Sequence, residues 1–387
     1  MKKFLFWATL LGVSFTSCVN DNDSVLSSEE NPQPITFEVG KYKPSSRAEE
    51  VFPIDWTFGT FAFYENAATQ GHSVYMDNVE IQHYNAATPY WAATAEFGEY
   101  MWPHQGHLDF VSYYPYEKYK NGENYTSNTL SSVVPKLNST LNQLSYTGFT
   151  VDEANPVDLL YSNKALAYKA NTVHYGFTGV PTLFHHALAM LSFKVRAQRL
   201  NNEASSPSAV TRWNVTLNSV KIDGIYNQGS VTLNVGAHPS TAEVQIWRKN
   251  DIYQTWDYSG ATITRTWAPK YSSIPGQVLT TSTEGILLGE SSDGNDVASQ
   301  YFVLPQVLSE NQQTITVNYT VHSTSPLGQE GTNTYEVTKS FSNFTSVLAW
   351  EMGKHITYII EIDPAGDIIN FAPSIEDWVG VNGTITF

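Results

Sequence analysis

The chain has 387 residues, a formal net charge of −16 and a single cysteine. One cysteine excludes an internal disulfide framework and a thiolate metal site, and the negative charge disfavours nucleic acid as a partner because phosphate groups would be repelled. Aromatic residues make up 13% of the chain and charged residues 15%, which indicates an ordered, β-rich protein, since flat aromatic side chains suit pleated strands.

The first 18 residues, MKKFLFWATLLGVSFTSC, have the organisation of a lipoprotein signal peptide. Lys2 and Lys3 form a positive region, Phe4 to Phe15 form an apolar region, and Cys18 follows two small residues. The apolar run is shorter than the roughly 20 residues that span a bilayer, and lipoprotein processing needs a cysteine thiol as the acyl acceptor. We therefore expect removal of residues 1–17 and a lipid on Cys18, which would tether the chain to a bacterial membrane outside the cytoplasm. The alternative is a chance cysteine in an ordinary signal peptide.

Residues 18–47 are predicted to form a polar tether that contains one short strand. Ile35, Phe37 and Val39 alternate with polar residues, which is the pattern of a strand with one apolar face. The tether ends at Arg47, which lies among Ser and Pro before Ala48 and is an accessible target for a trypsin-like protease. A plain surface arginine is the alternative interpretation.

Beyond residue 47 the pattern is strand, turn, strand. The clearest predicted strands are HLDFVSYY, ALAMLSFKV, RWNVTLNSVKI, GSVTLNV, QTITVNYTV and KHITYIIEI. Many short strands without a sustained helical period predict an all-β fold of antiparallel β-sandwiches. The 340 residues after residue 47 exceed one sandwich core, so we expect two domains. The polar stretch around Pro207 is the best linker, which gives domains at residues 48–207 and 208–387.

Motifs for catalysis, metals or cofactors are weak, so we expect no enzyme activity, no metal and no cofactor. His104 and His107 are interpreted as residues of a polar turn, in preference to a zinc site. The adjacent His185 and His186 are expected to point to opposite faces of a strand. Asp152 and Glu153 could serve a glycosidase only with a geometry that the sequence does not reveal. The acidic run 291–296 lacks the final glutamate of a calcium loop. The N-x-[ST] triplets are interpreted as chance, among them the six that begin at Asn124, Asn138, Asn214, Asn318, Asn343 and Asn382.

Several segments together resemble the fimbrillins of the Bacteroidetes, the family of major and minor pilins. They are YMWPHQGHLDFVSYYP, DLLYSN and FHHALAMLSFKV in the first half, and YFVLPQ, TITVNYTV, GKHITYIIEID and IEDWVGVNGTITF in the second. The resemblance implies two β-sandwich domains with transthyretin-like Greek-key topology, made as a lipoprotein and assembled into fimbriae. It also implies cleavage by a trypsin-like protease after Arg47, and Asp21 and Asp23 resemble a surface-export signal of Bacteroidetes lipoproteins.

A sandwich that lacks one strand accepts an extended peptide from another chain. Ile35, Phe37 and Val39 would then be a placeholder strand that cleavage frees. The replacement is predicted in the last nine residues, in which the large apolar side chains share one parity: Val379, Val381, Ile385 and Phe387. Four large apolar side chains against three favour the exchange by about 2 kcal/mol. The alternative is that this last strand closes its own sandwich.

The predicted function is therefore a stalk, tip or accessory subunit of fimbriae that mediates adhesion at the outer membrane. The expected partners are other fimbrial subunits, the outer membrane through the lipid, and surface glycans or proteins of host or bacteria. A carbohydrate-binding surface lipoprotein is the first alternative, because exposed aromatic rings stack on sugars, and an uncharacterised hydrolase is the second. For the carbohydrate-binding alternative, the candidate residues that would stack on sugar rings are Trp91, Trp102, Trp247 and Trp256, which could equally be core residues.

Overall fold

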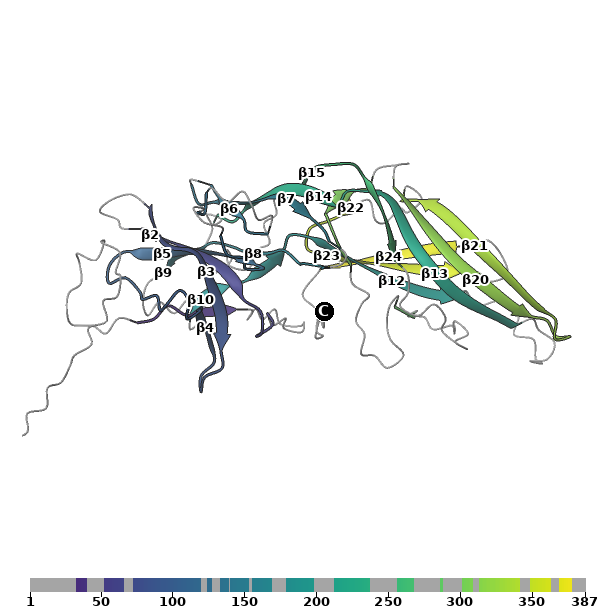
Figure 1. Ribbon diagram of the computed structural model, residues 1–387, viewed down its shortest axis with the longest axis horizontal. Helices are drawn as coiled ribbons and strands as arrows, with labels where there is room; N and C mark the ends of the chain where they lie inside the picture. The colour runs from purple at the N-terminus through teal and green to yellow at the C-terminus, as the bar shows by residue number, and fades with distance from the viewer. Residues whose placement is uncertain are drawn as a thin grey trace, which may run out of the picture.

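The computed structural model describes fifteen stretches of the chain between residues 33 and 377. They are residues 33–39, 52–65, 72–119, 124–126, 133–138, 140–152, 155–168, 179–197, 212–236, 256–267, 286–287, 301–308, 313–341, 349–362 and 369–377. Within them the regular structure is entirely β, without an α-helix. The molecule is elongated, with the N-terminal strands gathered at one end and most of the C-terminal strands at the other (Figure 1). The all-β prediction is confirmed, and so are the six strands predicted from alternation.

A nine-stranded sheet forms the N-terminal end. Its path runs β10-β1-β4-β3-β2-β5-β8-β11, with β9 paired to β5. The strands are β1 (Phe37–Val39), β2 (Phe58–Glu65), β3 (His72–Tyr84), β4 (Tyr90–Ala93), β5 (His107–Tyr114), β8 (Leu160–Ser162), β9 (Ala165–Tyr168), β10 (Val180–Thr182) and β11 (Phe184–His186). The two ends of this path, β10 and β11, are separated in sequence by Leu183 alone, so the sheet curls until its ends meet. The result is a curled sheet, called the barrel below, in which the described residues of β10 and β11 form no ladder with each other.

Apolar side chains from around the sheet fill the barrel. The enclosed cluster draws on nearly every strand of the sheet and on Phe52 before β2; its members are Ile35, Phe37, Val39, Phe52, Phe58, Ala62, Met76, Val79, Ile81, Trp91, Leu108, Phe110, Leu160, Ala165 and Val180. Because side chains alternate between the two faces of a strand, β2 and β5 bury Phe58 and Phe110 inside the barrel and leave Phe61 and Val111 for a second core outside it.

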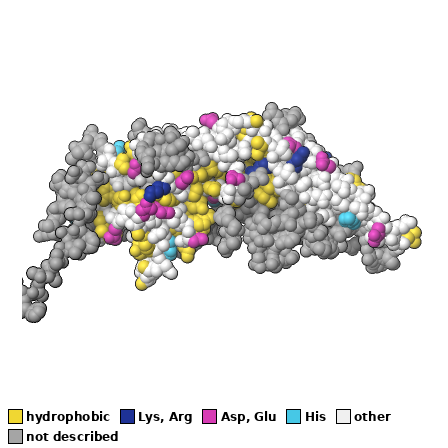
Figure 2. All heavy atoms as spheres, viewed as in Figure 1, with side chains coloured by type: hydrophobic (Ala, Val, Ile, Leu, Met, Phe, Trp, Pro, Cys, Tyr) yellow, Lys and Arg dark blue, Asp and Glu magenta, His cyan; other side chains and the backbone are white. Residues whose placement is uncertain are grey.

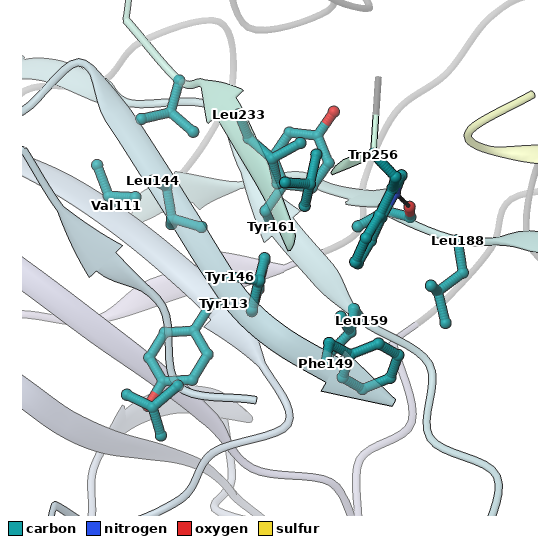
Figure 3. Packing of buried hydrophobic residues seen from close by; sticks show 14 of the residues in the cluster. Val111, Tyr113, Leu144, Tyr146, Phe149, Leu159, Tyr161, Leu188, Leu233 and Trp256 are labelled. Carbon is teal, nitrogen blue, oxygen red and sulfur yellow. Dashed lines mark hydrogen bonds between the residues drawn. The ribbon is translucent and has the colours of Figure 1, made fainter. Parts of the chain in front are cut away.

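A four-stranded sheet covers that outer face of the barrel. Its order is β15-β14-β7-β6, with β6 (Lys136–Leu137), β7 (Gln143–Thr150), β14 (Gln228–Asn234) and β15 (Asp257–Tyr258). Leu144 and Leu233 from this sheet pack with Tyr113 and Tyr161 of the barrel (Figure 3). Trp256 lies in the same core and its indole N–H donates to the carbonyl oxygen of Ala187 at 3.1 Å.

Two further sheets face each other at the other end of the molecule as a sandwich. One has the order β17-β12-β23-β24 with β18 paired to β12, and the other has the order β16-β13-β20-β21. Their strands are β12 (Ala189–Ala197), β13 (Arg212–Ile225), β16 (Ile263–Trp267), β17 (Ile286–Leu287), β18 (Tyr301–Val303), β20 (Thr314–Thr324), β21 (Glu330–Ser340), β23 (Lys354–Ile362) and β24 (Ile369–Asp377), and the pair β19 (Gln306–Val307) and β22 (Ala349–Trp350) lies apart from them in sheet order. Phe193, Tyr319 and Tyr358 are fully buried between the sheets. The outer face over β20 and β21 is mostly polar and uncharged (Figure 2), with the hydroxyls of Thr320 and Thr334 3.1 Å apart.

Strands that precede residue 207 pair with strands that follow it, at both ends of the molecule. β12, which precedes it, pairs in parallel with β23, while β14, which follows it, pairs with β7. Pro207 itself lies outside the described residues, in the stretch 198–211. The sheets are therefore not divided at the predicted linker. Two of the pairings, β1 with β10 and β12 with β23, are parallel, whereas the sequence pattern predicted antiparallel sandwiches.

Candidate functional site

The short strand β1 lies inside the barrel wall with a neighbour on each side. Phe37 pairs with Trp91 of β4 in antiparallel sense, and Phe37 to Val39 pair with Val180 to Thr182 of β10 in parallel sense. The main chain before β1 is also held, because the N–H of Ile35 donates to Tyr100 O at 2.8 Å and Gln33 O accepts from the N–H of Trp102 at 2.9 Å. We call the space that residues 33–39 occupy the β1 slot.

Three apolar side chains of the slot residues line the interior of the barrel. Ile35, Phe37 and Val39 expose only 3%, 3% and 7% of their surface. The ring of Phe37 packs edge-on against Phe58 and Phe110, with centroid distances of 5.9 and 5.7 Å. Burying three such side chains stabilises the barrel by about 5–9 kcal/mol, at about 1.5–3 kcal/mol for each. Strand β1 is thus both a strand of the barrel sheet and part of the core.

Gly179 allows the main chain of the slot strand to approach closely. A Cβ atom at this position would lie 2.7 Å from Thr36 O and 3.0 Å from the carbonyl carbon of Phe37. The next residue uses that proximity, since the N–H of Val180 donates to Thr36 O at 2.8 Å. Any side chain at Gly179 would push the slot strand away from β10.

Phe52 belongs to a group of aromatic rings in the same core as the β1 slot. It is stacked on Phe184 at 5.0 Å, and it contacts Trp91 and Phe58 at 5.5 and 5.8 Å. Phe58 therefore touches both Phe37 and Phe52. The chain that leads into β1 and the chain that resumes at Phe52 end in the same aromatic core, although the residues between them, including the predicted cleavage point, lie outside the described residues.

The other predicted site residues fall outside the part of the chain that the structure describes. They are Cys18, Arg47, Ala48, Val379, Val381, Ile385 and Phe387. Trp247, Glu153 and residues 291–296 also lie outside it. Their predicted roles stay predictions.

The histidines singled out in the sequence make local polar contacts. His104 is exposed, and His107 binds one oxygen of Glu65 at 2.9 Å while His72 binds the other at 2.7 Å. His186 binds Asp158 at 2.7 Å, and His185 packs against Tyr161. Within the described stretches no three His, Cys, Asp or Glu side chains are placed to hold a metal ion. The sequence did not reveal Glu65 and His72 as neighbours of His107, because β2, β3 and β5 bring them together only in the sheet.

The tryptophans proposed as a sugar platform are largely core residues. Trp91 and Trp256 expose 7% and 2% of their surface, and the half-buried Trp102 packs edge-on against Phe110. Their rings fill the two N-terminal cores and do not form an exposed row. The structure thus gives these three residues the alternative role that the sequence allowed, that of core or core-flanking side chains.

The sequence did not predict a buried ion pair that lies in the barrel wall. Lys164 Nζ lies 3.0 Å from Asp109 Oδ2, with side-chain exposures of 5% and 3%. Asp109 sits in β5 between the buried Leu108 and Phe110, which is a signal in itself: a carboxylate within an apolar strand requires a buried partner. The sequence does not identify Lys164 as that partner, because the two residues are far apart along the chain.

The model of the family described as fimbrillin-like matches residues 47–378 of the chain. The chain belongs to the fimbrillin-like family. The resemblance seen in the sequence is therefore confirmed, and membership supports the role of a fimbrial subunit at the cell surface. No curated protein matches this fimbrillin-like chain.

A solved structure shares the fold of this fimbrillin-like protein, and a second one is similar to it over most of the chain. A fimbrial protein from Bacteroides vulgatus is 15% identical with a TM-score of 0.52, and the match covers 89% of this chain and 99% of that one. A candidate cell adhesion protein from Bacteroides ovatus is 15% identical with a TM-score of 0.47, over 91% of this chain and 100% of that one. Among the described residues, none belongs to a helix long and apolar enough to span a membrane.

Proposed function

We propose that this fimbrillin-like protein is a structural subunit of surface fimbriae that mediate adhesion, and that its subunits are joined by exchange of the strand in the β1 slot. The observation that carries the proposal is the placement of β1. A three-residue strand from the N-terminal tether is paired on both edges and fills the barrel core, yet it is joined to the rest of the barrel by the segment that contains Arg47. One cut in that segment would make this strand of the sheet part of a separate peptide.

The exchange follows from the chemistry of an open strand position. After cleavage at Arg47 the tether is held in the slot only by noncovalent contacts, and its loss would leave unpaired main-chain groups on β4 and β10 beside an apolar pocket. Such an edge binds an extended peptide through main-chain hydrogen bonds, with alternate side chains entering the pocket. We infer that the segment with Val379, Val381, Ile385 and Phe387 of a neighbouring subunit provides that peptide. A structural role of this kind requires no catalytic residue.

Limited proteolysis of the purified precursor tests the proposal. Trypsin at a low ratio should produce a chain that begins at Ala48 and should convert monomers into oligomers, as read by N-terminal sequencing and light scattering. An Arg47→Gln variant is the control and should stay monomeric under the same treatment. If the cut chain that begins at Ala48 remains monomeric at high concentration, strand exchange through this slot is wrong.

The lipid on Cys18 is a separate part of the proposal. We expect Cys18→Ala to move the protein from the detergent phase to the aqueous phase or to leave an uncleaved precursor, because acyl chains provide about 0.8 kcal/mol for each buried methylene. Phase partitioning with Triton X-114 and intact-cell protease accessibility measure the change. Unchanged detergent partitioning of the variant would show that Cys18 is not the outer-membrane anchor.

A further inference from the structure

The strand β21 ends its sheet and is long for an edge strand. It has eleven residues and pairs with β20 alone among the described strands. The pairs run from Thr314↔Ser340 to Thr324↔Glu330 without a register shift, so β21 contains no bulge. It lies along the outer border of the C-terminal end (Figure 1). Between Gly331 and Lys339 the side that faces away from β20 has no strand partner in the described part of the chain, so its main chain can pair with another strand.

The other strands that end a sheet carry features that discourage pairing between molecules. Natural edge strands are kept short or are interrupted by proline, bulges or charges. In the part of the chain that the structure describes, β24 has nine residues, but Pro373 at its centre has no N–H to donate. The remaining edge strands have five residues or fewer; they are β6, β9, β10, β11, β15, β16, β17, β18, β19 and β22. Strand β21 is long and has neither proline nor bulge, which indicates an edge that is used for pairing.

Contacts on both faces hold β21 in place. Its even-numbered residues lie on the outer face, and the hydroxyl of Thr334 lies 3.1 Å from that of Thr320 on β20. On the inner face the ring of Tyr335 stacks on that of Tyr319, with the centroids 5.3 Å apart. Val337 also packs against the C-terminal core. The edge is therefore a regular strand before any partner binds.

We propose that β21 pairs with β21 of a second copy of this chain, in antiparallel sense about a two-fold axis at Tyr335. Two four-stranded sheets would thereby join into one. Among antiparallel registers, this one pairs all eleven residues of the strand. It places Thr332 opposite Thr338 and Thr334 opposite Glu336 of the second copy, so polar outer faces continue across the junction. Threonine pairs of this kind stabilise neighbouring strands.

The sequence of β21 favours its own copy as the partner. In the proposed register no two like charges lie opposite each other, because Glu336 faces Thr334, and Glu330 and Lys339 face uncharged residues. Parallel pairing in register would place each glutamate beside its own copy, and an axis moved to Glu336 would place two carboxylates opposite each other. Both arrangements are unfavourable. A two-fold contact also uses the same surface on both molecules, as most homodimers do.

The contact is expected to be weak between two isolated chains. A single strand edge buries less than the roughly 1,200 Å² of a standard interface, and the net charge of −16 on each copy adds repulsion. Chains in dilute solution should therefore stay largely monomeric. Subunits in two neighbouring fibres would repeat the contact and gain avidity. The contact itself requires neither cleavage at Arg47 nor strand exchange.

Disulfide trapping in the uncut chain tests the contact. All variants carry Arg47→Gln, which prevents cleavage, and Cys18→Ser, which removes the single native cysteine. Thr332→Cys and Thr338→Cys are mixed at high concentration under mild oxidation, and mass spectrometry identifies the dimers. Opposite residues of antiparallel strands lie within disulfide reach, so the mixture should give dimers that join one variant to the other. Each variant alone should give roughly 10-fold fewer dimers, because its own position in the second copy lies beyond that reach.

His322→Cys mixed with Thr338→Cys is the matched control. His322 is exposed on the same face and pairs with Thr332, but it lies on β20, one strand further from the edge. This mixture should give only the background of random collisions. Because Thr332 and Thr338 are also exposed, all three cysteine variants should keep the unfolding temperature of the parent chain.

Two charge variants test the register a second time. Added to the mixture of Thr332→Cys and Thr338→Cys, Thr334→Lys would face Glu336 on both sides of the axis and should raise the yield of dimers roughly 5-fold. Thr334→Glu would oppose the same carboxylates and should lower the yield by a similar factor. An edge that pairs without a fixed register should lose yield with both variants, since a lysine also discourages edge pairing.

Each result decides. Mixed dimers in excess over the His322→Cys control, with opposite effects of the two Thr334 variants, support the contact. If the mixture gives no more dimer than that control, β21 does not pair with a second copy and the proposal is wrong. If Thr332→Cys alone dimerises as well as the mixture, or if both Thr334 variants lower the yield, the register is wrong. None of these results bears on the proposed strand exchange, because the chain is uncut throughout.

Discussion

Lys164→Met is expected to lower the free energy of unfolding by about 3–5 kcal/mol, the usual effect of removing one member of a buried ion pair. The ammonium of Lys164 lies 3.0 Å from Asp109 in the barrel wall, and both side chains are almost fully buried. Methionine has a similar length but no charge, so the Asp109 carboxylate would stay buried without its cation. Urea unfolding at neutral pH, followed by tryptophan fluorescence, measures the loss.

The double variant Lys164→Met with Asp109→Leu is the control for this prediction. It removes both charges and keeps apolar volume, so it should regain most of the lost stability, because replacing a buried ion pair by apolar residues is often neutral or stabilising. The exposed pair of Lys118 and Glu96 offers a second comparison. Lys118→Met should change stability by 1 kcal/mol or less, in the range of about 0–1 kcal/mol found for surface ion pairs. Equal effects of Lys164→Met and Lys118→Met would contradict the importance of the buried pair.

Ile385→Asp is expected to abolish oligomer formation after cleavage at Arg47, while Thr384→Asp should leave it intact. In the proposed exchange Ile385 would lie on the inward face of the donated strand, and a carboxylate there would be buried without a partner, at a cost of several kcal/mol. Thr384 would face outwards and retain its hydration. Light scattering of both cut variants measures assembly, and thermal unfolding of both uncut variants measures stability.

The same pair of variants distinguishes exchange from the alternative that the last strand closes its own sandwich. With exchange, uncut Ile385→Asp should unfold at the same temperature as the wild type and fail only in assembly. With closure of its own sandwich, the uncut variant should already lose several degrees, because the strand would be part of the monomer core. Equal stability and equal assembly of the two variants would mean that the segment is neither donor nor core.

Local patterns in the sequence predicted the strands well, but they did not predict which distant strands pair. KHITYIIEI alternates apolar and polar residues, and β23 covers that stretch with Ile356, Tyr358 and Ile360 buried. The sequence carries no comparable signal for the parallel partner of β23, because β12 lies more than 150 residues earlier and alternation does not identify partners. The curling of the sheet that brings β10 close to β11, and the neighbours of His107, could not be predicted for the same reason.

The slot was predictable in part. The alternation of Ile35, Phe37 and Val39 indicated a short strand within a polar tether. Its place between β4 and β10 depends on Gly179, and a single glycine in a sequence does not indicate which main chain will approach it. The aromatic group around Phe52 likewise gathers rings from distant strands. These are properties of the folded barrel and not of any one segment.

The strand β12 joins the two ends of the elongated molecule, and its surroundings have a mechanical consequence. Met190 belongs to the N-terminal core, whereas Leu191 and Phe193 belong to the C-terminal one, and eight successive residues of β12 are paired in parallel with β23. These two strands lie roughly along the long axis of the molecule (Figure 1), so a pull applied along that axis would act along both of them. Such a pull would load the paired residues in shear, all together, instead of peeling them apart one after another. The junction between the two ends is therefore expected to resist tension better than a flexible linker would.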